Sequence, residues 1–252
     1  INFPAVYDML SRMKAKLDAG RSILYQTARY VDIYKALEDI ARDRTLTPEE
    51  RKEMKLYSRL ADAFTPLAKG MNSEYANQNA YDAISVHGGS GFIMEYKCQR
   101  LFRDARIFSI YEGTTQLQVV AAIRYVTNGT YLGIIKEMLE KEVAPEFQAL
   151  KERVAKMVEK YEDAINYVKA AGNNDLHDFL ARRLYEMTAE IIMSLLILDD
   201  ATRAPELFAK SANVYVRYAE GTVAGHYAYI KEFKAEDLAD FLAVAPEEAP
   251  AE

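Results

Sequence analysis

The helical character of the chain is set by residues 47–89, which read TPEERKEMKLYSRLADAFTPLAKGMNSEYANQNAYDAISVHGG. Thr47 is a typical N-cap, Pro48 suits the first turn of a helix, and Glu50 completes a capping box. Two consecutive glycines at the other end are typical of residues that stop a helix. The stretch therefore predicts one long helix that begins at Pro48 and ends at about His87.

Helical periodicity continues on both sides of this stretch. Apolar residues at helical spacing predict another long helix from about Ala5 to Asp43. Residues 90–113 indicate a loop with a short helix near 96–102. No strand pattern longer than about four residues is present. Further helices are predicted over Thr115–Asn128, 130–171 with a break near Pro145, Asp175–Asp200 with Asp175 as the cap, Pro205–Lys231 and a short segment at 235–243.

This pattern predicts an all-α protein in which a helical bundle is followed by a second α-helical module. We place the bundle at residues 1–128 and the helical C-terminal extension at 129–244. The tail, residues 245–252, is rich in proline, alanine and glutamate, and we expect it to be disordered.

Composition excludes several classes of protein. The 252 residues carry a net charge of -6, whereas a nucleic-acid surface needs clustered positive charge. With one cysteine, Cys98, no internal disulfide can form, and the three histidines show no metal-ligand spacing. The longest apolar run, Ile191–Leu198, is too short to span a membrane, and no signal peptide is visible.

A candidate catalytic group lies in residues 106–117, RIFSIYEGTTQL. Glu112 lies between the mostly apolar residues 107–111 and a Gly-Thr-Thr sequence that is typical of a helix start. A carboxylate in apolar surroundings has a raised pKa, which suits a base that removes a weakly acidic C–H proton. A solvated loop residue, or a charge at the N-terminus of the next helix, is the alternative interpretation of Glu112.

Three motifs in fixed order carry a family resemblance. They are VHGGSGF at 86–92, RLFRDAR at 100–106 and IYEGTTQ at 110–116. In this order and spacing, residues 4–126 resemble the C-terminal domain of the acyl-CoA dehydrogenases. The resemblance implies an FAD-dependent enzyme that catalyses α,β-dehydrogenation of acyl-CoA thioesters.

The same resemblance bears on how much of the usual protein is present. The chain begins Ile1-Asn2-Phe3-Pro4, without a methionine, and runs at once into a helical pattern. The resemblance then implies a C-terminal piece whose bundle lacks its first helix. We expect such a piece to be inactive alone.

Site roles near Glu112 follow from the resemblance. It implies that Glu112 removes the α-proton while a hydride leaves Cβ for flavin N5. The Glu112 backbone N–H and a flavin hydroxyl would polarise the thioester carbonyl. Tyr111 and Gly113 are implied to contact the substrate, although a core tyrosine with a satisfied hydroxyl is an equally simple interpretation of Tyr111.

Four further residues are implied to bind the cofactor. Gly88 and Gly89 would allow close approach of the FAD pyrophosphate of a neighbouring subunit, and we expect a positive φ at Gly89. Thr114 and Gln116 would touch the adenosine end of FAD. The alternatives are a helix C-cap for the glycines and a helix N-cap for Thr114 or Thr115.

The resemblance also implies partners and leaves other functions open. Electron-transfer flavoprotein is the expected electron acceptor, and a homodimer or homotetramer is the expected assembly. The expected compartment is the cytoplasm, or the mitochondrial matrix in a eukaryote. An acyl-CoA oxidase and a non-catalytic helical assembly or binding module remain alternatives. No motif assigns a role to the extension after residue 128.

Overall fold

The computed structural model of the chain describes residues 2–242, and every regular element among them is helical, which confirms the all-α prediction. None of these helices is long and apolar enough to cross a membrane. The predicted disordered tail, 245–252, lies outside the described residues. The elements are α1 Pro4–Asp43, α2 Pro48–His87, α3 Gly89–Phe92, α4 Cys98–Ala105, η1 Arg106–Ser109, α5 Thr115–Thr127, α6 Thr130–Glu140, η2 Pro145–Phe147, α7 Gln148–Ala171, α8 Asn174–Arg203, α9 Pro205–Glu232 and η3 Ala235–Phe241.

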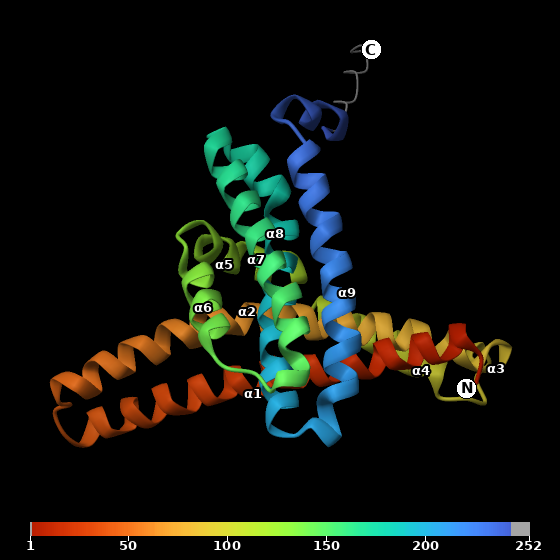
Figure 1. Ribbon diagram of the computed structural model, residues 1–252, viewed down its shortest axis with the longest axis horizontal. Helices are drawn as coiled ribbons and strands as arrows, with labels where there is room; N and C mark the ends of the chain where they lie inside the picture. The colour runs from red at the N-terminus through yellow and green to blue at the C-terminus, as the bar shows by residue number, and fades with distance from the viewer. Residues whose placement is uncertain (1, 243–252) are drawn as a thin grey trace, which may run out of the picture.

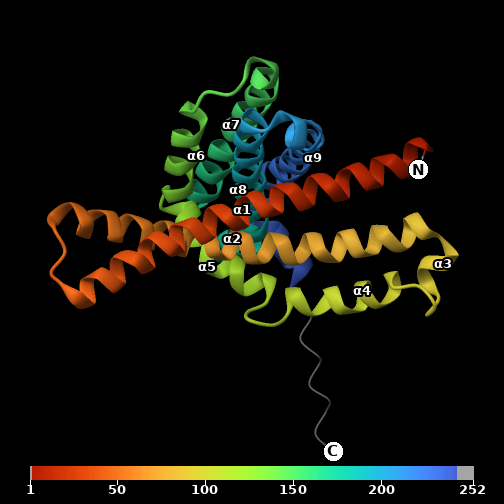
Figure 2. The same cartoon turned by 90° about the horizontal axis from the view of Figure 1, so that it is seen from below.

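Helices α1 and α2 form a long antiparallel hairpin (Figures 1 and 2). Each contains 40 residues, which corresponds to about 60 Å of helix. The predicted capping box opens α2: the Glu50 amide donates to Thr47 Oγ1 at 3.2 Å, and the Thr47 amide donates to Glu50 Oε2 at 2.9 Å. Gly88, with a φ of 59°, ends the helix as predicted.

The helices after residue 128 stand crosswise on this hairpin (Figure 1). Tyr131, Tyr161, Tyr185 and Tyr215 from these helices are fully buried, as is Phe64 of α2. They belong to one continuous hydrophobic core. The bundle and the extension are therefore stabilised by the same buried apolar surface.

Two local predictions need correction. The segment predicted as loop over 90–113 is more helical than expected, because α4 buries Cys98 and Ala105 and the Asn77 side chain donates to the Ala105 carbonyl at 3.1 Å. The cap of α8 is Asn173 rather than Asp175. Asn173 has an extended backbone, and its Oδ1 accepts the Leu176 amide at 2.9 Å, which leaves Asp175 inside the first turn.

Helix α8 approaches α2 closely at a glycine. The Tyr185 hydroxyl donates to the Pro66 carbonyl at 2.9 Å. A Cβ at Gly70 would lie 2.1 Å from that hydroxyl. The approach therefore requires a residue without a side chain at position 70.

We predict that Gly70→Ala destabilises the chain by about 1–3 kcal/mol, because the added methyl group displaces the buried Tyr185 ring. Gly133→Ala in α6 is the control, since a Cβ there has no atom within 4 Å. Alanine in that helix should raise stability by about 0.5–1 kcal/mol. Thermal unfolding of both variants measures the difference, and a neutral Gly70→Ala would contradict the packing described.

A buried carboxyl group lies where α2, α8 and α9 meet. Glu190 is 1% exposed, and its carboxylate accepts the Tyr75 and Tyr215 hydroxyls, each at 2.7 Å. Burial raises the pKa of Glu190 to about 7, against the opposing effect of the two tyrosine hydrogen bonds and of nearby Lys16. Burial likewise lowers the pKa of Lys16, whose ammonium lies 4.5 Å from the centre of the Tyr218 ring.

We predict that the raised pKa of Glu190 makes the chain less stable as pH rises from about 4.5 to about 7. In this window the folded state binds more protons than the unfolded state, so ionisation favours unfolding, by up to about 3 kcal/mol above pH 7. Glu190→Gln removes this dependence. Urea unfolding at pH 5 and pH 8 tests it. The free energy of unfolding of Glu190→Gln, relative to that of the wild type, should be higher at pH 8 than at pH 5. The same difference at both pH values would refute the prediction.

Candidate functional site

The turn that carries Glu112 has an unusual backbone. Glu112 has a φ of 54° and is the one non-glycine residue with a positive φ between residues 2 and 242. This left-handed region is costly for residues with a side chain, and such strain concentrates at functional sites. The predicted apolar enclosure of Glu112 is wrong for the described residues, because Glu112 is exposed and the Ile110 and Tyr111 side chains also face solvent.

Lys69 of α2 holds this turn on both sides. Its ammonium donates to the Phe108 carbonyl at 2.9 Å, before Glu112, and to the Gly113 carbonyl at 2.5 Å, after it. The Gln118 side chain donates to the same Gly113 carbonyl at 3.3 Å. The role of Lys69 has no signature in the sequence, since 39 and 44 residues separate it from its two acceptors.

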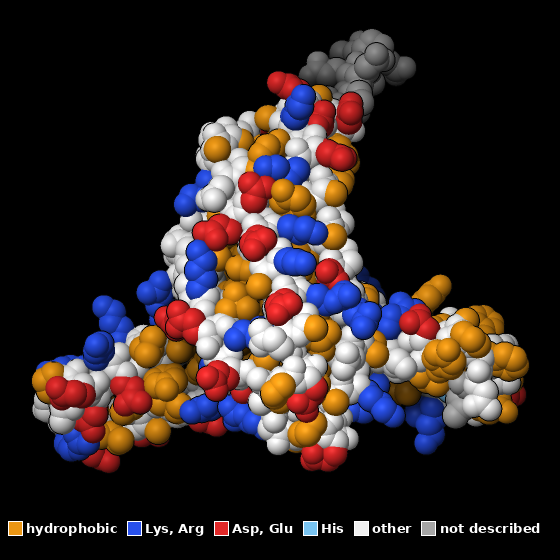
Figure 3. Space-filling view, in the orientation of Figure 1, with side chains coloured by type: hydrophobic (Ala, Val, Ile, Leu, Met, Phe, Trp, Pro, Cys, Tyr) orange, Lys and Arg blue, Asp and Glu red, His pale blue; other side chains and the backbone are white. Residues whose placement is uncertain are grey.

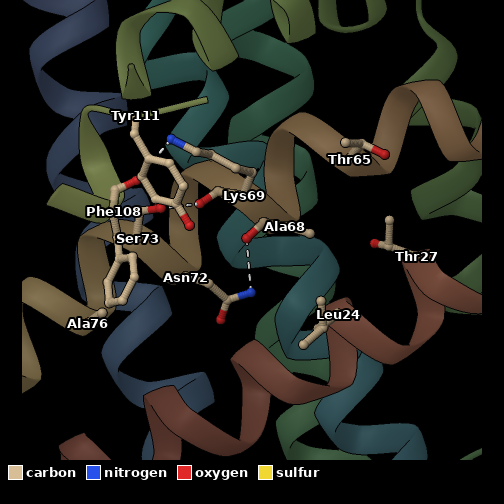
Figure 4. A pocket seen from close by; sticks show the side chains of 10 residues that line it. All are labelled: Leu24, Thr27, Thr65, Ala68, Lys69, Asn72, Ser73, Ala76, Phe108 and Tyr111. Atoms are coloured by element: carbon tan, nitrogen blue, oxygen red, sulfur yellow. Dashed lines mark hydrogen bonds between the residues drawn. The ribbon is translucent and has the colours of Figure 1, made fainter. Parts of the chain in front are cut away.

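An apolar groove of about 490 Å³ lies beside the turn (Figure 4). Phe108 and Tyr111 line it on one side, and Leu24 of α1 lies across from them. Lys69 and Asn72 of α2 supply polar groups at its wall. The groove can accept a flexible apolar chain next to a carboxylate-bearing turn.

A second cleft, of about 470 Å³, lies at the start of α5. Thr114 and Gln116 line it together with Arg106 and Arg182. Thr114 also caps α5, because its Oγ1 accepts the Leu117 amide at 3.2 Å, as the capping interpretation predicted. Arg182 comes from α8, and no sequence pattern indicates that the extension reaches this cleft.

The glycine pair lies at the far end of α2. Gly88 ends α2 and Gly89 begins α3, so the C-cap interpretation is confirmed. A Cβ at either glycine would have no atom within 4 Å, and both positions therefore face open space. The expected positive φ belongs to Gly88 and not to Gly89, because Gly89 is already the first residue of a helix.

The structure does not bring all predicted site residues together. Lys69, which contacts the Glu112 turn, and Gly88 are 19 residues apart along α2, or about 28 Å. Tyr111, Glu112, Gly113 and Thr114 are grouped, whereas the glycines are distant from them within one chain. No group of three or more metal-binding side chains occurs between residues 2 and 242.

Family models of known proteins match both halves of the chain. A family described as "Acyl-CoA dehydrogenase, C-terminal domain" matches residues 1–126. A second, described as "Acyl-CoA dehydrogenase C terminal", matches residues 127–238.

Individual relatives agree with these matches. The caffeyl-CoA reductase-Etf complex subunit CarC of Acetobacterium woodii is 32% identical over 117 residues, 46% of this chain and 24% of the relative. Butyryl-CoA dehydrogenase of Syntrophomonas wolfei is 27% identical over 236 residues, 88% of this chain and 36% of the relative. The chain thus spans between a quarter and about a third of the length of these relatives.

A solved structure supports the fold over nearly the whole chain. An acyl-CoA dehydrogenase from Bacillus anthracis, complexed with FAD, has a TM-score of 0.68 at 20% identity. The alignment covers 95% of this chain and 44% of that one. Since a family model matches half of the sequence and this architecture agrees with it, the chain belongs to the acyl-CoA dehydrogenase family.

Proposed function

We propose that the protein containing this chain is an FAD-dependent acyl-CoA dehydrogenase in which Glu112 is the catalytic base. The observation that carries this proposal is the strained Glu112 turn, held by Lys69 beside an apolar groove. Membership of the family and the name of the butyryl-CoA dehydrogenase relative support an acyl-CoA thioester as substrate.

Glu112 would take the proton from the α-carbon of the thioester. Its backbone N–H would donate to the thioester carbonyl oxygen, which stabilises the negative charge that develops there. Bound FAD would supply the hydride acceptor, flavin N5, for the hydride that leaves Cβ, and the Cα–Cβ bond would become double. The exposure of Glu112 in this chain requires that bound substrate and other parts of the protein exclude water during proton transfer.

The groove beside the turn is suited to the acyl chain. Tyr111 and Phe108 offer aromatic surface, and Gly113 allows close approach of the thioester to the backbone. The Lys69 ammonium donates its hydrogen bonds to backbone carbonyls of the turn. It therefore orients the turn, and the groove remains largely apolar.

Features of the chain fit an FAD site that is shared between subunits. Thr114 and Gln116 line a cleft with Arg106, whose positive charge suits the anionic dinucleotide. Arg182, in the same cleft, is paired with Glu74 and Glu186. Gly88 and Gly89 have open space for a pyrophosphate but lie about 28 Å from Lys69 along α2. A neighbouring subunit's FAD therefore suits the glycines, and the protein would be a homodimer or homotetramer.

Exposed apolar side chains around the glycines support this assembly. They gather at the right-hand end of the molecule in Figure 3, near α3. Phe92 is 77% exposed and Met94 is 87% exposed. Burial of such side chains between subunits is favourable. The chain alone supplies only part of this shared site, so we infer that it is inactive alone.

Electron-transfer flavoprotein is the proposed electron acceptor. The relative CarC is named as a subunit of a complex with such a protein. Transfer of electrons to this acceptor, rather than to oxygen, would distinguish the dehydrogenase from an acyl-CoA oxidase.

We predict that Glu112→Gln in the full-length protein lowers turnover by about two to four orders of magnitude, because it removes the base and keeps the shape. Flavin content should not change. Glu159→Gln, which alters an exposed carboxylate on α7 outside the turn, is the control. Steady-state assays with an acyl-CoA series measure the effect, and near-normal turnover of Glu112→Gln would refute Glu112 as the base.

We predict that Gly89→Val leaves the chain folded and removes flavin from the full-length protein. A Cβ at position 89 has no atom of the chain within 4 Å, so loss of flavin from a folded variant reports the close approach of a ligand or of the neighbouring subunit that holds it. Gly133→Val, at another helical glycine with open space, is the control. Circular dichroism and flavin absorbance give the two readings. Retention of stoichiometric flavin would mean that the glycine serves only the helix end.

A further inference from the structure

Arg182 connects the extension to the turn region. It lies on α8, and its Nε donates to Glu186 Oε1 at 2.8 Å. Its Nη2 lies 3.7 Å from Oε1 of Glu74, on α2. Glu186 in turn contacts His226 of α9 at 2.8 Å. The network therefore spans three helices and both halves of the chain.

The carboxylate that Arg182 approaches also holds the start of α5. The Thr115 hydroxyl donates to the same Glu74 oxygen at 2.6 Å. Thr115 is buried, and it follows Gly113 and Thr114 directly. The position of Glu74 therefore fixes the chain on the C-terminal side of the Glu112 turn.

The turn is thus anchored twice to α2, by Lys69 and by Glu74. Helix α8 packs against the same part of α2, where the Tyr185 hydroxyl lies at Gly70 and donates to the Pro66 carbonyl. One face of α8 contacts α2 near both anchors. The Tyr185 hydroxyl lies at Gly70, which follows Lys69, and Arg182 lies beside Glu74.

We propose that Arg182 is a positioning residue, which orients Glu74 for Thr115 and so fixes the Glu112 turn. The extension after residue 128 is then a working part of the catalytic site. This inference rests on the proposed role of Glu112. Arg182 and Glu74 are partly exposed, with 45% and 27% of their side chains accessible, and exposed ion pairs contribute little to overall stability. Loss of Arg182 should therefore loosen the turn without unfolding the protein.

The test uses the full-length flavoprotein with substitutions along the network. Arg182→Met and Thr115→Val remove one contact each, and Thr115→Ser keeps the hydroxyl. Arg203→Met is the matched control, because Arg203 makes an equivalent ion pair with Asp199 on the same helix, away from the turn. The readouts are kcat, KM, flavin content and hydrogen–deuterium exchange of residues 109–118.

We expect Arg182→Met and Thr115→Val each to lower kcat by about threefold to tenfold, with KM and flavin content unchanged. Exchange over residues 109–118 should be faster in both variants. In the double variant the two effects on kcat should not add, because both substitutions break the same chain of contacts from Arg182 through Glu74 to Thr115. Thr115→Ser and Arg203→Met should behave as wild type.

Three outcomes separate this proposal from the proposed function. Loss of flavin in Arg182→Met would overturn the proposal and make Arg182 a cofactor contact. Unchanged kcat and exchange in Arg182→Met, with an inactive Glu112→Gln, would overturn the proposal and leave the function standing. Faster exchange in Arg182→Met, together with unchanged turnover in both Arg182→Met and Glu112→Gln, would confirm that Arg182 orders the turn. It would also refute Glu112 as the base.

Discussion

The close contact between α8 and α2 at Gly70 is the constraint on which the rest of the structure depends. It brings the extension onto the hairpin at the place where α2 carries its two anchors for the Glu112 turn. A larger residue at position 70 would separate the two helices and shift Tyr185, Arg182 and their partners together. The fold and the candidate site therefore share one packing requirement.

A second junction specifies how the two halves fit. Glu190 of α8 accepts hydrogen bonds from Tyr75 of α2 and from Tyr215 of α9. A buried carboxyl group is costly unless these partners are all in place, so an alternative packing of α8 on the hairpin would leave polar groups unpaired. The network thereby favours one arrangement of α2, α8 and α9.

Local signals predicted the helices well. The capping box at Thr47, the glycine stop at Gly88 and the apolar periodicity act over a few residues, and the structure confirms them. The prediction of Asp175 as the cap of α8 is wrong by two positions, because Asn173 has a capping ability similar to that of an aspartate. The motif around Glu112 could be recognised, but its exposure could not, because burial depends on distant parts of the fold. Lys69 and Arg182 were missed for the same reason: their partners lie far away in sequence.

The positive φ of Glu112 has a consequence for how this protein can change over evolution. Glycine would adopt this conformation without the cost of roughly 1–2 kcal/mol that a side chain incurs there. Random substitution combined with selection for stability alone would therefore tend to replace the glutamate. The proposed role of Glu112 as the base would offset this cost, and a relative without that role would be more stable with glycine at this position.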